Sequence, residues 1–431
     1  MFLIRHDKYT KHPIVRDGSR PGKTTGQLLL FCVCLAALVA LGACANDSEV
    51  SQAPQVYFVS ATAPEGGDGT SWETAFDHPQ DALDAARDGD QVWVAQGIYG
   101  PLDPAGGEVI RLESGVAVLG GFVGTEFEAD QRAPGSAVTV LDGQGSSYHV
   151  VTGADRAIID GFTVTGGSAV GNMPQSSSGG TYSGGGMFNA GVSPEIRNCL
   201  FVGNTASFNG GAIFNEDSDP LIVDCVFEGN TANFGGAMDN RGSSPTLVNV
   251  KFKNNTSIIS GGAAANFDGS PVFINVVFSG NSSGQIGGAV LSNNSDAVYT
   301  NCSFTGNKAT IGGGGIGMWQ GKTQITNSIL WDNQAGDGNA VLNVNGVANV
   351  NFSIVQGGFA GTGNQDRNPN FMQEGQWGPD GQWMEGDYKL TSLSPAVDSG
   401  TAAGAPAFDA DYILRPQFLA YDLGAFERSG P

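Results

Sequence analysis

A short motif returns six times between residues 201 and 333, about once every 26 residues, and it constrains the fold more than any other feature. Each copy has Phe or Leu followed three residues later by Asn, and a Gly-Gly phrase with small apolar residues separates most copies. The five regular copies place Phe at Phe201, Phe227, Phe252, Phe278 and Phe304, and Asn at Asn204, Asn230, Asn255, Asn281 and Asn307. A period this regular indicates a stack of similar units, each in contact with its neighbours.

Each repeat unit has the pattern of short strands and turns. Its apolar residues do not follow helical spacing, and Gly, Asn, Ser and Pro interrupt every stretch. Strict alternation from Ile196 to Phe201 predicts that Cys199 and Phe201 face the core, with Ile196 and Asn198 on the opposite face. The four strands of a β-propeller blade do not fit into 26 residues. The sequence therefore predicts an all-β fold, a single right-handed parallel β-helix in which each repeat forms one coil.

Stacked coils place equivalent residues one above another, about 4.8 Å apart. The five Phe residues are then expected to fill the core, and the five Asn residues to form a ladder of side-chain amides that bond to one another. We expect these asparagines to adopt the left-handed backbone of a turn, which Asn tolerates. A second polar ladder stands three residues before each Phe, from Asn198 to Asn327.

The sequence divides into segments of different character. The predicted segments are a lipoprotein signal peptide (1–43), a tether (44–55), an N-terminal cap with the first coils (56–170), the regular coils (171–355) and an irregular C-terminal segment (356–431). A short helix over 77–87 is expected to cover the first end of the solenoid, because stacked coils need covered ends.

The first segment has the features of a bacterial export signal. Six basic residues precede an apolar run from Leu28 to Leu41, which is too short to span a bilayer comfortably. The sequence Leu41-Gly42-Ala43-Cys44 resembles a lipobox, so Cys44 is expected to carry a lipid and to begin the mature chain; an ordinary signal peptide with a chance cysteine is the alternative. Ala45 replaces the Asp that resembles an inner-membrane retention signal, which favours the outer membrane, on its surface or periplasmic side.

The charge of the chain excludes one class of partner. Residues 1–43 hold six of the 20 basic and two of the 42 acidic residues, so the net charge without them is −26. Because phosphate binding needs a basic surface, nucleic acid is excluded as a partner.

Two cysteines occupy the same position in neighbouring coils. Cys199 and Cys225 stand where Val250 and Val276 stand in later coils. They are therefore interpreted as small core residues, although a disulfide between them is geometrically conceivable.

Two stretches resemble known protein families. The alternation of Gly-Gly-Ala-Ile with Phe-x-x-Asn over 184–333 resembles the repeats of chlamydial polymorphic outer membrane proteins, which are surface adhesins. The tail over 364–427 resembles the choice-of-anchor Q region of exported bacterial β-helix proteins. Its matching residues include Asn368-Pro369-Asn370-Phe371, Gly386-Asp387-Tyr388-Lys389-Leu390, Ser394-Pro395-Ala396-Val397-Asp398 and Asp422-Leu423-Gly424-Ala425-Phe426-Glu427. Both resemblances imply a surface-located β-helix and say little about activity.

A catalytic alternative stays open, because many β-helices cleave polysaccharides. A lyase of the pectate type needs carboxylates that bind Ca²⁺ and an Arg or Lys base on one exposed face. The candidate base is Arg241, and the candidate calcium ligands are Asp217, Asp239 and Asp268. A glycosidase would need two carboxylates at a defined separation, for which Asp224 and Asp239 are the candidates. Turns favour Asp in any acidic chain, however, so these residues are also expected without catalysis.

The sequence therefore favours a non-catalytic lipoprotein that is held at the membrane by a lipid and binds a glycan or a cell-surface ligand along one face of the solenoid. No cofactor is expected for this function. Ca²⁺ enters only with the alternative, an enzyme that acts on acidic polysaccharide.

Overall fold

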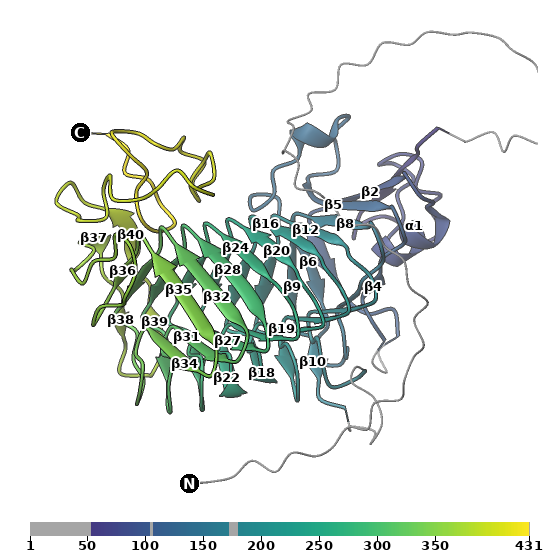
Figure 1. Cartoon of the computed structure of the whole chain (residues 1–431). Coiled ribbons are helices and arrows are strands. Elements are labelled where there is room, and N and C mark those ends of the chain that lie inside the picture. Colours follow the sequence, from purple (N-terminus) through teal and green to yellow (C-terminus); the bar gives the residue numbers. More distant parts are fainter. Residues whose placement is uncertain (1–52, 104–106, 172–179, 431) are drawn as a thin grey trace, which may run out of the picture. The chain divides into compact units, whose positions relative to one another are not determined.

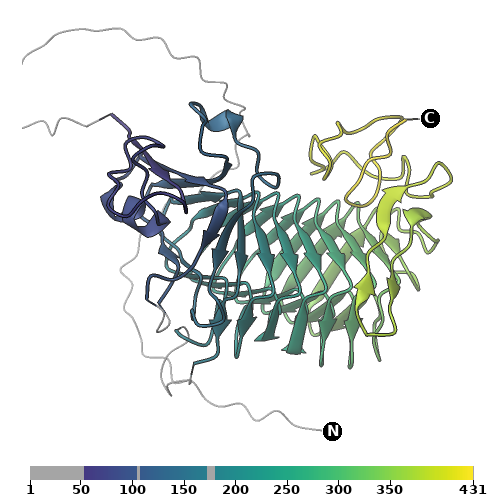
Figure 2. The ribbon, with the colours of Figure 1, turned by 180° about the vertical axis from the view of Figure 1, so that it is seen from behind.

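The computed structural model describes residues 53–103, 107–171 and 180–430, so the signal peptide and Cys44 lie outside the described residues. The described chain forms a right-handed parallel β-helix whose strands stack along one axis (Figure 1). Each regular coil passes in turn through four sheets, which we name A, B, D and C in chain order. Seen from behind, the first coils and the C-terminal segment lie at opposite ends of the stack (Figure 2).

Sheets A and B contain the longest stacks of strands. Sheet A consists of β1 (Val56–Val59), β2 (Gln91–Ala95), β5 (Ala117–Phe122), β8 (Ile158–Asp160), β12 (Glu195–Arg197), β16 (Leu221–Val223), β20 (Thr246–Val248), β24 (Val272–Ile274), β28 (Asp296–Thr300), β32 (Lys322–Thr326) and β35 (Val347–Asn351). Sheet B consists of β3 (Gly97–Tyr99), β6 (Thr139–Asp142), β9 (Phe162–Thr165), β13 (Leu200–Val202), β17 (Val226–Glu228), β21 (Lys251–Lys253), β25 (Val277–Ser279), β29 (Ser303–Thr305), β33 (Ile329–Trp331) and β36 (Ile354–Val355).

Sheets C and D complete the coils. Sheet C consists of β4 (Ile110–Arg111), β7 (Val151–Thr152), β11 (Met187–Ala190), β15 (Ile213–Glu216), β19 (Met238–Arg241), β23 (Ala264–Phe267), β27 (Val290–Asn293), β31 (Ile316–Trp319) and β34 (Val341–Val344). Sheet D consists of β10 (Ser168–Ala169), β14 (Thr205–Ala206), β18 (Thr231–Phe234), β22 (Thr256–Ser260), β26 (Ser282–Ser283) and β30 (Lys308–Ala309). The other elements are α1 (Pro79–Ala85), the 3₁₀ helix η1 (Ala129–Gln131), β37 (Phe371–Gln373), β38 (Gln376–Trp377), β39 (Trp383–Met384) and β40 (Asp387–Leu390).

The repeated phenylalanines form a continuous column in the core. Phe201, Phe227, Phe252, Phe278 and Phe304 pair in register along sheet B, and all five are 0% exposed. Successive rings stack with centroids 4.5–5.2 Å apart. The core is therefore built by repetition of one contact from coil to coil.

The chain turns a corner where the sequence pattern predicts a straight strand. Asn198 has a φ of 47°, and its equivalents from Asp224 to Asn327 have φ between 52° and 55°. This left-handed residue separates β12 from β13 and reverses the alternation, so Ile196 and Phe201 are both buried. The prediction that Ile196 faces away from the core is wrong, because it assumed one unbroken strand.

The repeated asparagines lie just after a second corner and are fully buried. Each side chain donates to the Oδ1 of the next Asn, at 2.8–3.2 Å. Each also donates to a backbone carbonyl of the preceding coil, which is that of Val164 for Asn204 and that of a Phe for the others, as for Asn230 and Phe201. The left-handed backbone falls one residue earlier, at Gly203, Gly229 and their equivalents. The expectation that the ladder asparagines themselves adopt it is wrong.

The C-terminal segment packs against the outer side of sheet B. Val277, Ile329 and Ile354 share a buried apolar cluster with residues of that segment, among them Phe371 and Phe426. Amides of the second polar ladder also reach it: Asn275 donates to the Phe408 carbonyl, Asn301 to that of Asp422 and Asn327 to that of Thr401, at 2.8–3.0 Å. Hydrogen bonds of this ladder therefore connect successive coils to one another and to the C-terminal segment.

The first residues of the described chain already belong to the solenoid. Strand β1 is the edge strand of sheet A, and α1 lies within the helix expected over 77–87. Cys199 and Cys225 are buried free thiols. None of the helices in the described ranges is long and apolar enough to span a bilayer.

Candidate functional site

Arg241 and Asp239 form a closed pair on the outward side of β19. They are two residues apart on one strand, so both side chains point the same way, and Arg241 Nε lies 2.9 Å from Asp239 Oδ1. The Asp239 side chain is fully buried, and burial raises the pKa of its carboxyl to about 6 although the Arg241 guanidinium opposes this shift. Arg241 also donates to Asn209 Oδ1 at 2.9 Å and lies 4.4 Å above the Phe267 ring. A guanidinium held in this way is poorly suited to accept a proton from a substrate.

The candidate calcium ligands do not converge. Asp217 and Asp268 occupy left-handed corner positions between sheets C and A, with φ of 48° and 58°. One coil lies between theirs, and Gly242 occupies the same corner in it. The Asp268 carboxylate accepts a hydrogen bond from the Asn294 side chain at 2.5 Å, in the following coil and on the side away from Asp217. In the described part of the chain, no group of three or more His, Cys, Asp or Glu side chains is arranged to hold a metal ion. The three aspartates therefore do not form one calcium site in this structure.

The glycosidase candidates lie at different places on the coil. Asp224 is at the corner between sheets A and B, where its carboxylate accepts hydrogen bonds from Asn249 and Tyr412. Asp239 is in sheet C. The two carboxyl groups therefore do not face each other across one cleft.

A row of mixed aromatic and polar side chains follows the outward side of sheet C. The last positions of successive strands pair in register, and we call these six residues the sheet C row: Ala190, Glu216, Arg241, Phe267, Asn293 and Trp319. Trp319 is 42% exposed, and Phe267 is half-buried. Flat aromatic faces beside hydrogen-bonding groups are the usual parts of a ligand-binding surface.

Further aromatic rings extend this surface: Phe208 lies in the segment that connects β14 to β15, and Phe234 is the last residue of β18. The Phe208 and Phe234 rings are 5.8 Å apart, and Phe234 is 5.8 Å from Phe267. Arg241 also lies over the Phe234 ring, at 5.9 Å. The rings and the guanidinium pack against one another. These side chains therefore have little conformational entropy left to lose when a ligand binds.

Sequence reasoning missed the sheet C row because its members lie at the least regular position of the repeat. The same position holds Ala, Glu, Arg, Phe, Asn and Trp in successive coils, so no ladder is visible. The one available signal was the extra Phe just before the Gly-Gly phrase at Phe208 and Phe234.

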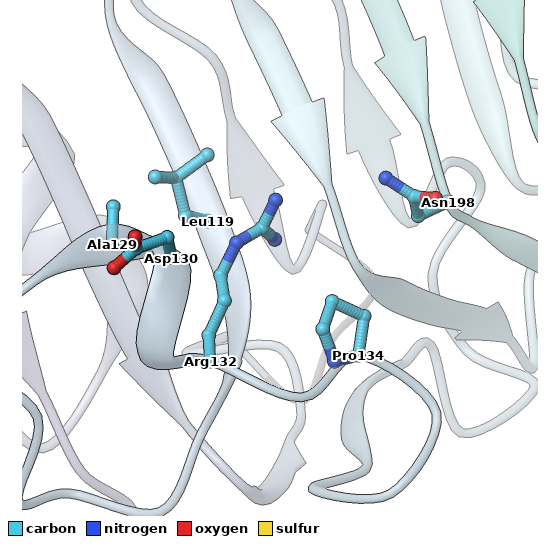
Figure 3. A pocket seen from close by; sticks show the side chains of 6 residues that line it. All are labelled: Leu119, Ala129, Asp130, Arg132, Pro134 and Asn198. Atoms are coloured by element: carbon cyan, nitrogen blue, oxygen red, sulfur yellow. The ribbon is translucent and has the colours of Figure 1, made fainter.

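A separate cavity of about 540 Å³ opens beside sheet A and is lined by Leu119, Arg132 and Asn198, among others (Figure 3). Arg132 forms an ion pair with Asp160 at 2.6 Å, and the two side chains are only 15% and 8% exposed. Arg132 also donates to the Gly120 carbonyl, and Asn198 donates to Asp160 at 2.8 Å. These contacts hold the segment around η1 against sheet A, which is a structural role.

Comparisons with known proteins found one matching repeat model and a similar solved structure. A model of the Chlamydia polymorphic membrane protein repeat matches residues 198–216, which run from the corner at Asn198 to the end of β15. No curated protein matches the chain. Among solved structures, the crystal structure of pectate lyase Pel9A is similar with 15% identity and a TM-score of 0.47, over 88% of this chain and 97% of that one. The described chain is a right-handed parallel β-helix, and its residues 198–216 are similar to the polymorphic membrane protein repeat.

Proposed function

We propose that the chain is an exported surface lipoprotein of the bacterial outer membrane that binds a glycan or cell-surface ligand through the sheet C row without cleaving it. The repeat match supports the location, because the matching family is described as a membrane protein family. The lipobox-like sequence before Cys44 supports export and lipid anchoring.

The observation that carries the binding proposal is the sheet C row with its supporting rings. The exposed Trp319 and the half-buried Phe267 offer aromatic faces, and Glu216 and Asn293 offer hydrogen-bonding groups between and beside them. The coil spacing sets these side chains at regular intervals of about 4.8 Å, which suits a ligand that is itself long and repetitive.

We propose that the chain does not cleave its ligand because the Arg241 side chain is already engaged by other residues. Its guanidinium neutralises the buried Asp239 carboxylate and is packed against Phe267. Releasing Arg241 toward a substrate would leave a buried carboxylate without its partner, which costs several kcal/mol. The pair is therefore better suited to support a binding surface than to transfer protons.

Removing the aromatic faces is expected to weaken ligand binding. Trp319→Ala and Phe267→Ala should each reduce binding about tenfold or more, which corresponds to about 1.4 kcal/mol for one lost aromatic contact. The measurement is a titration of the full-length protein on arrayed glycans and on cells. Phe127→Ala is the matched control, because Phe127 is 86% exposed and lies outside the row. Equal losses in all three variants would refute a role for the row.

Lipid anchoring predicts that Cys44→Ala releases the protein from membranes. The wild type should incorporate labelled palmitate and partition into the detergent phase, because two or more acyl chains hold a protein stably at a bilayer. The variant should be unlabelled and soluble. A wild type that is unlabelled and freely secreted would contradict the anchor and leave the binding proposal standing.

A further inference from the structure

Strand β34 forms an open edge at the C-terminal end of the solenoid. It is the last strand of sheet C and, within the described ranges, pairs only with β31. The carbonyls of Ala340 and Val344 accept backbone hydrogen bonds at 2.9 Å from the coil that contains β31. Because successive residues of a strand direct their backbone groups to opposite sides, the N–H and C=O groups of Val341 and Asn343 point away from β31. No strand of the described chain lies there to pair with them.

The neighbouring edges at this end are covered. The segment after β36 folds back over sheets A and B. In sheet A the Phe352 N–H, just after β35, donates to the Thr362 carbonyl at 2.7 Å. In sheet B the Val355 N–H donates to the Gln365 carbonyl at 2.9 Å. The edge of sheet C is left open, and its Asn343 is exposed.

The opposite end of sheet C is closed. Helix α1 lies against the first strand, β4, and the Gln80 side chain of the helix accepts a hydrogen bond from the Arg111 N–H at 2.7 Å. Sheet A is closed at the same end, because both backbone groups of Phe58 on β1 bond at 2.9 Å to the segment that contains Gly69 and Phe76. Copies of the chain therefore cannot stack head to tail through sheets A and C.

The end of the solenoid around β34 lacks the features that usually keep edge strands apart. Natural edge strands are blunted by charged side chains or proline. Residues 338–365, which include β34, contain no Asp, Glu, Lys, Arg or Pro, although 14% of the chain is charged. The many acidic residues elsewhere would repel a second copy, whereas this end carries no charge to oppose a close approach.

We infer that β34 pairs with β34 of a second copy of the chain, antiparallel and about a two-fold axis that passes beside Leu342. The free backbone groups of Val341 then bond to those of Asn343 in the second copy, and the reverse pair forms on the other side of the axis. A contact of this kind needs only one surface, since each copy offers the same edge to the other. The closed first end of sheet C leaves this two-fold contact as the way in which two copies can extend the sheet.

Pairing at β34 would extend the binding surface of the proposed function. Sheet C would continue from one copy into the other, and the two-fold axis would keep both sheet C rows on the same side of the sheet. Trp319 lies on β31, so three strand spacings, about 14 Å, would separate the β31 strands of the two copies. A long ligand could then contact both rows. This consequence rests on the proposed function, but the pairing of the two edges does not.

Disulfide trapping of the isolated full-length protein tests the pairing. Residues that face each other beside the axis have Cα atoms about 4.5 Å apart, which a disulfide can bridge. Leu342→Cys should therefore form a covalent dimer under mild oxidation. Asn349→Cys is the matched control, because Asn349 is exposed on β35 in the same last coil and should stay monomeric. Wild-type protein supplies the background, since its described cysteines are buried.

Two further substitutions block the edge without touching the new cysteine. Asn343→Pro removes an N–H that the single chain does not use, and proline is tolerated on such edges. Asn343→Lys keeps the N–H and adds the charge that the edge lacks. Each should reduce trapping of Leu342→Cys at least tenfold, with circular dichroism to verify the fold. Sedimentation of the wild type should show a dimer that dissociates on dilution, because a short strand buries little area.

Three results would overturn the inference. They are a wild type that sediments as a monomer while Leu342→Cys forms no disulfide, equal trapping of Leu342→Cys and Asn349→Cys, and trapping that neither substitution of Asn343 reduces. A disulfide formed in cells between Leu342→Cys and a different protein would also overturn it, because the edge would then pair with that protein. Binding to arrayed glycans by monomeric protein would leave the proposed function intact in each case.

Discussion

Replacing Phe252 with Ala is expected to destabilise the β-helix by about 3–5 kcal/mol. Phe252 is 0% exposed and stacks between Phe227 at 4.8 Å and Phe278 at 5.2 Å, so the substitution leaves a cavity in the middle of the column. The stacked coils on both sides limit how far the structure can close around the cavity. Urea unfolding followed by circular dichroism measures the change.

The exposed Phe127 supplies the matched control, since Phe127→Ala removes the same ring from an 86% exposed position. Its free energy of unfolding should stay within about 0.5 kcal/mol of the wild type. If Phe252→Ala were as mild as the control, Phe252 would not lie in the core and the register of the coils would be wrong.

Replacing Asn255 with Ala is expected to cost about 3 kcal/mol or more, although few apolar atoms are removed. The Asn255 side chain accepts from the backbone N–H and the amide of Asn230, both at 3.0 Å, and donates to the Phe227 carbonyl and Asn281 Oδ1, both at 2.9 Å. All these groups are buried, and each one left without a partner costs about 1–3 kcal/mol.

The control for this variant is Asn349→Ala, because Asn349 is an exposed asparagine of the same solenoid. It should change the free energy of unfolding by less than about 0.5 kcal/mol. Equal effects of the two substitutions would mean that the asparagine ladder does not hold the coils together.

The period of the repeat was enough to predict the stack, because each coil places the same residue types over those of its neighbour. The corners were not predictable by alternation alone. Asn198 and Gly203 both have positive φ, at 47° and 66°, and each rotates the chain before the next strand begins. Asn and Gly both tolerate the left-handed backbone of such corners, so the sequence limits the corner positions to these residues. The packing of neighbouring coils then decides which Asn or Gly forms the corner.

The candidate sites were less visible in the sequence than the fold. The sheet C row varies from Ala190 to Trp319, since its side chains face outward and no stacking requirement holds them constant. The hairpin of β38 and β39 packs Trp377 against strands of sheet D that lie more than 60 residues earlier in the chain. No local pattern encodes such a contact, and it depends on single glycines at Gly280 and Gly306.

We propose that this β-helix binds its ligand and does not cleave it. The most direct test follows ultraviolet absorbance while the full-length protein is incubated with pectate or alginate and Ca²⁺, because cleavage by a lyase creates unsaturated products that absorb there. Arg241→Ala is run in parallel, with circular dichroism to verify that the variant is folded. Both proteins are expected to give a flat absorbance trace. A rise with the wild type that disappears in Arg241→Ala would refute binding without cleavage and make Arg241 the base of a lyase.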